Sequence, residues 1–329
     1  MSYTNGLDKP SDYFVTKLYT GNSTGSTQQA ITGLDFSPNM VWIKPRSDAE
    51  KHSIADTVRG ATKTIHPHLA DAEETSAGHM VSFDANGYTV GVDNYSWNKN
   101  GSTYASWNWK ETADAGFDMI SYTGNGSSGR TISHNLNSVP SMIWTKDLGN
   151  AEHWGCYHKS LPAGYNIYLN LTNAEDDNNT LYTTTAPTSS VYSVGNNNRT
   201  NGNGRNYISY VFGEKQGYSK ISSFVGNGAN NFIYTGFSPA WVMIKKTDDT
   251  HDWHIFDNKR DVYNERDSWL EANNTQAETT SSNYVVDFLS NGFKTGSGSG
   301  LNGSGETFIF MAFASNPLVT STGVPATAR

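Results

Sequence analysis

The sequence is poor in several residue types on which other protein classes depend. It has a single cysteine, Cys156, among 329 residues, which excludes an internal disulfide and a metal cage of thiolates. Charged residues make up only 16% of the chain, and 23 Lys and Arg stand against 31 Asp and Glu, a net charge of −8. Because nucleic acid is held largely through Lys and Arg on its phosphates, this balance argues against a nucleic-acid-binding surface.

Long apolar runs are also missing. The longest apolar stretch is the short segment 308–314, far below the roughly 18 residues of a membrane-spanning helix. The N-terminus has no basic segment followed by an apolar one, so we expect no secretory signal and a protein made in the cytoplasm. In contrast, the chain contains 31 glycines and 12% aromatic residues. This combination is typical of turn-rich β proteins and excludes a chain that is disordered throughout.

An internal repeat is the most informative feature of the sequence. Tyr-Thr-Gly-Asn at residues 19–22 recurs at 122–125 and as Phe-Val-Gly-Asn at 224–227, so the glycines are 103 and 102 residues apart. Four further landmarks follow in the same order in each copy. They are a strand ending in lysine at 36–44, 138–146 and 237–245, a second strand at 52–56, 154–158 and 253–257, an Ala-Glu pair at 72–73, 174–175 and 277–278, and an aromatic strand at 104–109, 207–212 and 308–313.

We therefore interpret the chain as three tandem units at residues 17–112, 119–215 and 219–316. An N-terminal arm at 1–16 precedes them, and a C-terminal tail at 317–329 follows them. The connections between the units are too short for independent tumbling, so we expect the units to pack rigidly against one another.

The pattern within a unit predicts an all-β fold, with three tandem antiparallel units that are each a β-sandwich or a barrel. Short β-branched and aromatic runs alternate with Gly, Asn, Asp and Ser clusters. The strands expected in the third unit are 220–225, 232–234, 241–246, 253–256, 284–288, 293–295 and 307–314. The Asn-Gly pairs at 86–87 and 291–292 predict tight hairpins with positive backbone dihedrals. Helical turns are expected only near 72–75 and 269–273.

The lysine-ending strand has two apolar faces. Alternation places Val41 and Ile43 on one face and Met40 and Trp42 on the other. A free-standing sandwich exposes one face of each sheet, so the second apolar face needs a cover, either another unit or another subunit. The predicted packing interface consists of Met40, Trp42, Met142, Trp144, Trp241 and Met243.

The sequence gives only weak evidence for a catalytic or a metal-binding site. The acidic groups 73–74, 175–177 and Glu278 could supply paired carboxylates, but their recurrence in all copies favours a turn or cap role in the shared fold. The acidic segment 173–179 lacks EF-hand spacing and is expected to be a solvated loop. The histidine pairs lack ligand spacing and are expected on the surface or in loops; they are His66 with His68, His153 with His158, and His251 with His254. Cys156 aligns with Ile54 and Ile255 and is expected in the core. We thus predict no enzyme, no metal and no cofactor.

Aromatic residues outside the repeat are better candidates for binding, because binding residues concentrate on variable loops over a common scaffold. These are Tyr95, Trp97, Tyr263 and Trp269. Aromatic faces beside polar side chains suit the stacking of sugar rings. The alternative is that the four rings fill gaps between units.

Several segments resemble repeat-built virion proteins of short-tailed marine bacteriophages. The resemblance lies in the opening segment 8–14 with 18–22, in the Gly-x-x-Phe-Ser-Pro-like turns at 33–38 and 236–239, and in Trp-Asn-Trp-Lys at 107–110. It implies concanavalin- or laminin-G-like sandwiches in a tail, fibre or capsid-decorating protein. The second copy departs most, since His158 stands where the other copies have Asp56 and Asp257.

The resemblance favours a non-enzymatic structural component of a bacteriophage virion with a possible role in host attachment. We expect other virion proteins as partners and a homo-oligomer, by analogy a trimer, with host-surface glycan as a further contact and neither nucleic acid nor membrane insertion. A lectin-like glycan-binding module and a polysaccharide depolymerase are the alternatives.

Overall fold

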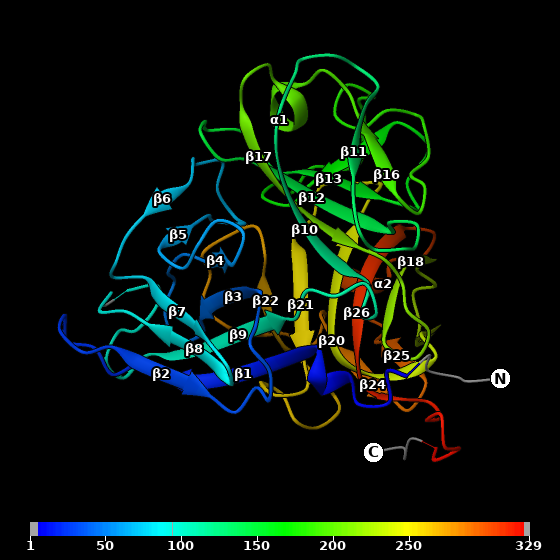
Figure 1. Ribbon diagram of the computed structural model, residues 1–329. Coiled ribbons are helices and arrows are strands. Elements are labelled where there is room, and N and C mark those ends of the chain that lie inside the picture. Colours follow the sequence, from blue (N-terminus) through cyan, green and yellow to red (C-terminus); the bar gives the residue numbers. More distant parts are fainter. Residues whose placement is uncertain (1–5, 94, 326–329) are drawn as a thin grey trace.

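A computed structural model describes residues 6–93 and 95–325 (Figure 1). Residues 1–5 of the expected arm and 326–329 of the expected tail lie outside this range. Strands form almost all of the regular structure, which confirms the predicted all-β fold. The helices are single turns, namely the 3₁₀ turn η1 (Pro10–Asp12), α1 (Asn198–Asn201) and α2 (Ser299–Asn302).

Three large antiparallel sheets share one strand order. In each sheet, the first strand of the repeat pairs with the last strand, and the last strand pairs in turn with the lysine-ending strand. The first sheet is β1 (Phe14–Thr20), β9 (Thr103–Trp109), β3 (Met40–Pro45) and β4 (Ser53–Asp56). The second is β10 (Phe117–Thr123), β17 (Asn206–Phe212), β12 (Met142–Asp147), β13 (Gly155–His158), β14 (Tyr165–Tyr168) and β15 (Asp176–Asp177). The third is β18 (Ser219–Val225), β26 (Thr307–Pro317), β20 (Phe237–Lys246), β21 (Trp253–Asp257), β22 (Ser268–Glu271) and β23 (Thr279–Thr280).

Smaller sheets complete the architecture. They are β2 (Gln29–Thr32), β8 (Gly87–Val90) and β7 (Met80–Asp84); β11 (Arg130–Ser133) and β16 (Val191–Val194); β19 (Asn231–Tyr234), β25 (Gly292–Thr295) and β24 (Val286–Leu289); and β5 (Lys63–Thr64) with β6 (Glu74–Thr75). We refer to the segments β1–β9, β10–β17 and β18–β26 as the first, second and third parts. In Figure 1 they lie at the left in blue and cyan, at the top in green, and at the lower right in yellow to red.

Each part has a hydrophobic core of its own between its large and small sheets. In the first part, Val41 and Ile43 of β3 pack in this core with Ile31 of β2 and Tyr88 of β8. All six residues of β3 are buried, so its opposite face is covered as well. The alternation predicted for the lysine-ending strand therefore holds, and its second face belongs to a different core.

The seven strands predicted for the third part are confirmed, each within a few residues of its expected bounds. The two expected helical turns are wrong. Residues Glu74–Thr75 and Ser268–Glu271 are strands, because each pairs with a neighbouring strand and this tertiary pairing outweighs weak local helical preference.

The two Asn-Gly hairpins form as predicted, but their glycines are needed for a different reason than expected. Positive φ occurs at Gly87 but at neither Asn86 nor Asn291. A Cβ atom on Gly87 would lie 1.9 Å from the Ile31 carbonyl oxygen, and one on Gly292 would lie 2.2 Å from the Ile233 carbonyl oxygen. Both glycines are therefore required by the close approach of the neighbouring strand.

The segment predicted as an N-terminal arm is largely part of the fold. Strand β1 begins at Phe14, whose ring stacks on Phe313 of the third part with centroids 4.9 Å apart. Leu7 is buried in the same region. The backbone nitrogen of Ser321 donates to Asp8 Oδ1 at 2.8 Å, so the arm also contacts the tail. Asp8 and Ser321, near the two limits of the described residues, thus meet beside the third part.

Candidate functional site

The residues predicted as a packing interface come together in a core shared by all three parts. This shared core includes Met40, Trp42, Met142, Trp144, Trp241 and Met243, and none of these side chains is exposed. Rings from different parts interlock within it. Trp42 and Trp144 meet edge to face with centroids 5.8 Å apart, and Trp107 and Trp241 at 6.3 Å. The outer faces of the large sheets are therefore covered within the chain itself.

The Ala-Glu landmark links each part to the next. The backbone nitrogen of Glu73 donates to the Leu148 carbonyl oxygen at 2.9 Å, from the first part to the second. Glu175 donates to Thr247 at 2.7 Å, from the second to the third, and Glu278 donates to Arg46 at 2.8 Å, from the third back to the first. These three equivalent bonds close the parts into a ring.

The carboxylates of the same landmark form ion pairs. Glu278 accepts from Arg46 Nη2 at 2.7 Å and from Arg260 Nη1 at 3.0 Å. Glu73 accepts from Arg59 Nη1 at 3.3 Å and from Lys63 Nζ at 3.1 Å. The Glu278 carboxylate thus joins the third part to the first, whereas the Glu73 carboxylate pairs within the first part. The contact between Glu278 and Arg46 was not evident from the sequence, because the two residues lie far apart in it.

Two of the interfaces contain a buried Asp–Arg pair with an aromatic donor from the neighbouring part. Arg260 Nε lies 2.5 Å from Asp257 Oδ2, and Trp107 Nε1 donates to the same oxygen at 3.2 Å. In the other interface, Arg59 Nε lies 2.5 Å from Asp56 Oδ2. Although burial alone would raise the pKa of Asp257, the charge and hydrogen bonds of Arg260 hold this pKa below its usual value.

The interface between the second and third parts lacks this arrangement. His158 occupies the register position of the two aspartates. Trp107 on β9 and Tyr210 on β17 occupy one equivalent register position, and the residue at this position on β26 is Met311. Burial lowers the pKa of His158 to about 3, so its imidazole is neutral at pH 7. At this interface a neutral histidine thus stands where the other two interfaces have a charged aspartate paired with an arginine.

The three repeated lysines are buried at the ends of their strands. Each Nζ atom donates to backbone carbonyl oxygens: Lys44 to Pro45 and Asp48, Lys146 to Asp147 and Asn150, and Lys245 to Lys246 and Thr172. Burial lowers the pKa of Lys44 to about 7 and those of Lys146 and Lys245 to about 8. Two of the three donors of each ammonium group are thus taken by carbonyl oxygens.

A set of buried asparagines explains the Gly-Asn landmark and was missed in the sequence. Asn98, Asn201 and Asn302 are completely or almost completely buried, and each Oδ1 accepts the backbone nitrogen of the landmark asparagine, at 2.9, 3.0 and 2.9 Å. The preceding glycine allows this approach, since a Cβ on Gly124 would lie 2.2 Å from the Gly202 carbonyl oxygen. These asparagines are spaced at about the pitch of the repeat, and this spacing could have identified them in the sequence.

The four candidate binding aromatics separate into two groups. Tyr95 and Tyr263 are exposed, by 58% and 80%, but lie on different parts. Trp97 is fully buried and stacks on His79 in the core of the first part, with centroids 5.5 Å apart. Trp269 is 7% exposed and packs against His254 and Tyr284. The two tryptophans are core residues and present no face to a ligand.

The expected surface or loop location is wrong for two of the histidines, because His158 lies on β13 and His254 on β21 and both are buried. His66, His68, His158 and His254 are buried. His66 contacts the His52 carbonyl oxygen at 2.6 Å and Glu74 Oε1 at 2.9 Å, so both of its ring nitrogens have partners. Within residues 6–93 and 95–325, no three His, Cys, Asp or Glu residues form a group that could hold a metal ion. Cys156 is fully buried, and this burial raises the pKa of its thiol.

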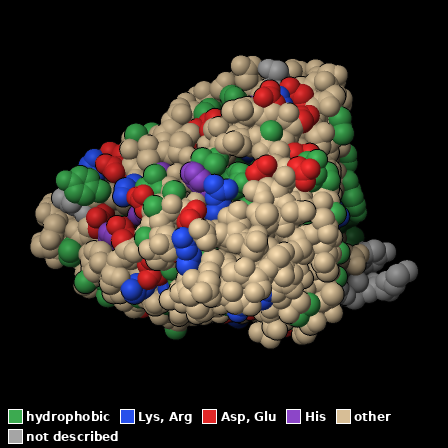
Figure 2. Space-filling model, turned by 90° about the horizontal axis from the view of Figure 1, so that it is seen from above, with side chains coloured by type: hydrophobic (Ala, Val, Ile, Leu, Met, Phe, Trp, Pro, Cys, Tyr) green, Lys and Arg blue, Asp and Glu red, His purple; other side chains and the backbone are tan. Residues whose placement is uncertain are grey.

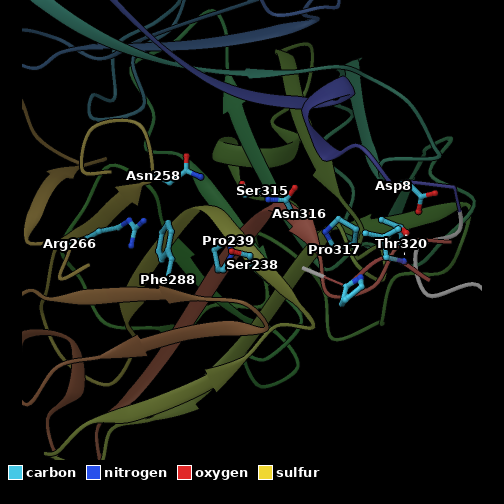
Figure 3. A pocket seen from close by; sticks show the side chains of 12 residues that line it. Asp8, Ser238, Pro239, Asn258, Arg266, Phe288, Ser315, Asn316, Pro317 and Thr320 are labelled. Carbon is cyan, nitrogen blue, oxygen red and sulfur yellow. Dashed lines mark hydrogen bonds between the residues drawn. The ribbon is translucent and has the colours of Figure 1, made fainter. Parts of the chain in front are cut away.

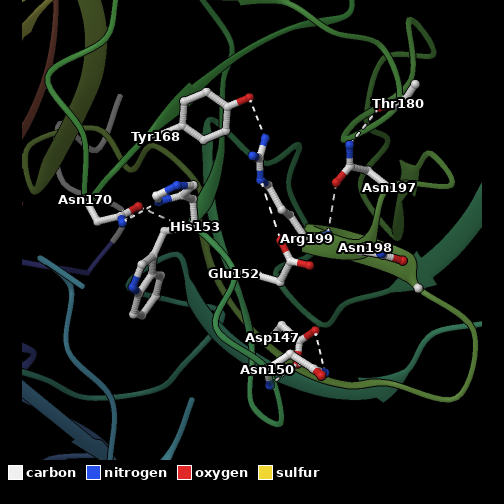
Figure 4. A network of polar contacts seen from close by, with 12 residues as sticks. Asp147, Asn150, Glu152, His153, Tyr168, Asn170, Thr180, Asn197, Asn198 and Arg199 are labelled. Carbon is white, nitrogen blue, oxygen red and sulfur yellow. Dashed lines mark hydrogen bonds and ion pairs between the residues drawn. The ribbon is translucent and has the colours of Figure 1, made fainter. Parts of the chain in front are cut away.

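A polar network joins the acidic segment of the second part to α1. Figure 4 shows the Arg199 side chain between Tyr168 and Glu152. Arg199 Nη1 donates to Tyr168 Oη at 3.0 Å, and Tyr168 Oη donates to Asp176 Oδ2 at 2.7 Å. Asp176 also belongs to β15, so this position is structured and not the solvated loop expected from the sequence. The network fixes α1 against the sheet.

A cavity of about 320 Å³ lies where the arm and the tail meet the third part (Figure 3). It is lined by Asp8, Asn258, Arg266, Phe288, Asn316 and Thr320, among others. The Arg266 guanidinium lies 4.4 Å from the centroid of the Phe288 ring. This cavity combines residues from segments that the sequence assigned to different units.

Much of the surface is uncharged. Backbone and uncharged polar side chains cover most of the face in Figure 2, and charged groups occur in small clusters on it. In the part of the chain that the structure describes, none of the helices has the length and apolar character needed to cross a membrane.

One comparison with known proteins gives a match. A family model described as a domain of unknown function (DUF7483) matches residues 9–317, from the arm to the end of β26. No curated protein and no solved structure matches the chain. The matched region contains all three parts.

Proposed function

The chain belongs to the DUF7483 family, and we propose that it acts as a non-enzymatic structural component of a bacteriophage virion, in a tail, a fibre or a capsid appendage. The observation that carries this proposal is the shared core, in which apolar residues of all three parts pack together. The recurring polar residues support it, because they close the ring or fix its turns. The resemblance of the repeat landmarks to phage virion proteins supplies the biological setting.

The arrangement of the parts bears on assembly. The apolar sheet faces that suggested contact between sister chains are buried inside a single chain. One chain thus already has the approximate three-fold organisation that we expected from a homotrimer. We propose that its partners are other virion proteins, contacted through the outer surfaces of the parts.

The depolymerase alternative has less support. Glu278 forms an ion pair with Arg46 of the first part, Glu73 pairs with Arg59 and Lys63 of its own part, and Glu74 contacts His66. A lectin-like activity is favoured by one specific observation, the exposed aromatic residues Phe232 and Tyr234 on β19. Glycan binding is compatible with a virion role, because many weak contacts add up when copies are displayed together.

The experiment that tests the virion role is mass spectrometry of phage particles purified by density gradient. We expect the chain at a constant ratio to the major capsid protein across gradient fractions that contain particles. Labelled antibody should then bind intact particles at defined positions in electron micrographs. Absence of the chain from purified particles would overturn the proposal.

A further inference from the structure

Two hollows meet at Glu214 and form a groove along the connection between the second and third parts. The larger, about 650 Å³, is lined by Glu214, Gln216, Lys220, Tyr234, Leu318 and Val319, among others. The smaller, about 360 Å³, is lined by Val139, Pro140, Tyr157, Lys159, Pro187 and Glu214, among others. Because Glu214 lines both hollows, they are adjoining, and we call them together the Glu214 groove. Its elongated form suits a chain-like ligand.

The middle of the groove carries more positive than negative charge. Glu214 Oε2 lies 2.6 Å from Lys159 Nζ, and Glu214 Oε1 lies 3.3 Å from Lys220 Nζ. The side chains of the two lysines are 33% and 35% exposed, so their ammonium groups keep donors directed to solvent. Two ammonium groups around one carboxylate leave an excess positive charge, in a protein whose net charge is −8.

One aromatic side chain, that of Tyr234, lines the larger hollow, and Phe232 stands two residues before it on the same strand. Tyr234 and Phe232 project from the outer face of β19, an edge strand, and are 58% and 47% exposed. Residues two apart on a strand lie about 6.7 Å apart along it. A Cβ on Gly236 would lie 3.4 Å from Tyr234 Oη, and one on Gly292 would lie 3.0 Å from the Phe232 ring. The rings thus extend over glycine backbone and leave much of their surface open.

The shared fold does not require these aromatic residues. The equivalent outer positions are Ala30 and Thr32 on β2 and Thr131 and Ser133 on β11, which are also exposed. Exposed aromatic residues occur at these positions only in the third part, next to the Glu214 groove. A purely structural role in the repeat would apply equally to all three parts.

Together these features match the chemistry of an acidic sugar chain. A pyranose ring has an apolar face of C–H groups that stacks on an aromatic ring, and a rim of hydroxyl groups that needs polar partners. We propose that the Glu214 groove binds a segment of a carboxylate-bearing polysaccharide, with one sugar stacked on Tyr234. Lys159 and Lys220 pair with its carboxylates, and Gln216 hydrogen-bonds its hydroxyls. This inference rests on the proposed virion function and names the ligand class of its host contact.

The test measures binding of an oligogalacturonate to the full-length protein by isothermal titration calorimetry. A neutral maltooligosaccharide of the same length serves as the comparison. We expect the acidic chain to bind more tightly, and its affinity to fall as salt is added, because the lysines are solvent-exposed. Failure to bind the acidic chain, or equal binding of both chains, would overturn the proposal.

Three variants locate the binding. Tyr234→Ala should weaken binding roughly tenfold, the factor that loss of one stacking contact gives. Lys220→Met should weaken binding and reduce its salt dependence. Tyr263→Ala removes an even more exposed tyrosine away from the groove and should leave binding unchanged. Equal effects of Tyr234→Ala and Tyr263→Ala would overturn the assignment of the groove.

Folding and function are separated by two controls. Thermal unfolding of the Tyr234→Ala variant should match that of the unaltered protein, because Tyr234 is largely exposed. The composition of purified particles tests the virion role independently. A chain that is present in particles but binds no oligogalacturonate contradicts only the inference, whereas a chain that binds the sugar but is absent from particles contradicts only the proposed function.

Discussion

Tyr210 of the second part donates a hydrogen bond of 2.5 Å to Asp56 Oδ2 of the first part. The same oxygen accepts from Arg59 Nε at 2.5 Å, so one carboxylate serves a partner within its own part and one in the next. All three groups are buried. This bond is a direct contact between polar side chains of the two parts, and it adds to the backbone bond from Glu73 to Leu148 across the same boundary.

We predict that Tyr210→Phe destabilises the protein by about 1–3 kcal/mol, because a buried carboxylate loses a donor that water does not replace. Chemical denaturation followed by circular dichroism measures this change in the free energy of unfolding. The control is Tyr263→Phe, which removes an exposed hydroxyl and should have no measurable effect. A Tyr210→Phe variant as stable as the unaltered protein would show that the bond does not stabilise the ring.

Arg46 and Arg260, which both pair with Glu278, should contribute unequally to the free energy of unfolding. Arg260 is fully buried, and Arg260→Met would leave Asp257 without its ionic partner, at a cost of about 3–5 kcal/mol. The Arg46 side chain is 21% exposed, and Arg46→Met should cost less than about 1 kcal/mol. The two variants are compared by denaturant unfolding under identical conditions. Equal costs would contradict the ranking by burial.

Stability should rise between about pH 7 and about pH 9. In this range the unfolded chain keeps its lysines protonated, whereas burial holds the pKa of Lys44 near 7 and those of Lys146 and Lys245 near 8. The unfolded state then binds more protons, so the free energy of unfolding increases with pH. Above this range Cys156 and the buried tyrosines act in the opposite direction, because burial raises their pKa values.

The measurement for this prediction is the midpoint of urea unfolding as a function of pH. Lys44→Met removes one of the three contributions, so its midpoint should rise less steeply over the same range. A midpoint that is flat or falls between these pH values in the unaltered protein would contradict the prediction.

The Gly-Asn landmark offers a matched pair of glycine substitutions. Gly124→Ala places a methyl group 2.2 Å from the Gly202 carbonyl oxygen, and relief of this overlap should cost about 1–3 kcal/mol. Gly149→Ala lies in the same part, and the nearest atom to its Cβ is 3.9 Å away. Thermal unfolding should therefore distinguish the two variants, with Gly149→Ala close to the unaltered protein.

The repeat made the strands and the covered sheet faces predictable. Alternation identified Met40 and Trp42 as interface residues, because a period of two residues follows directly from strand geometry. Alternation could not specify which surface covers them, since that depends on how the parts close into a ring. The contacts of Glu278 with Arg46 and of the Glu73 backbone with Leu148 were hidden for the same reason, because these partners are far away in the sequence.

The aromatic residues show a different difficulty. Trp97 and Trp269 stand outside the repeat, which suggested binding, yet both fill the core of their own part. Phe232 and Tyr234 were recognised only as strand residues, although they are exposed. Comparison with Ala30 and Thr32 at the same positions would have identified them. Departure from the repeat therefore indicates function only where the alternation also places the residue on the outer face.

The interface between the second and third parts differs from the other two, because His158 and Met311 occupy the positions that hold an aspartate and an aromatic donor elsewhere. Under heat or pulling force, we expect separation to begin there, between the second and third parts, while the joints with Asp–Arg pairs still hold. The Glu214 groove runs along this same joint. A sugar chain bound across this joint would hold the second and third parts together, so that ligand binding would raise the force needed to separate them.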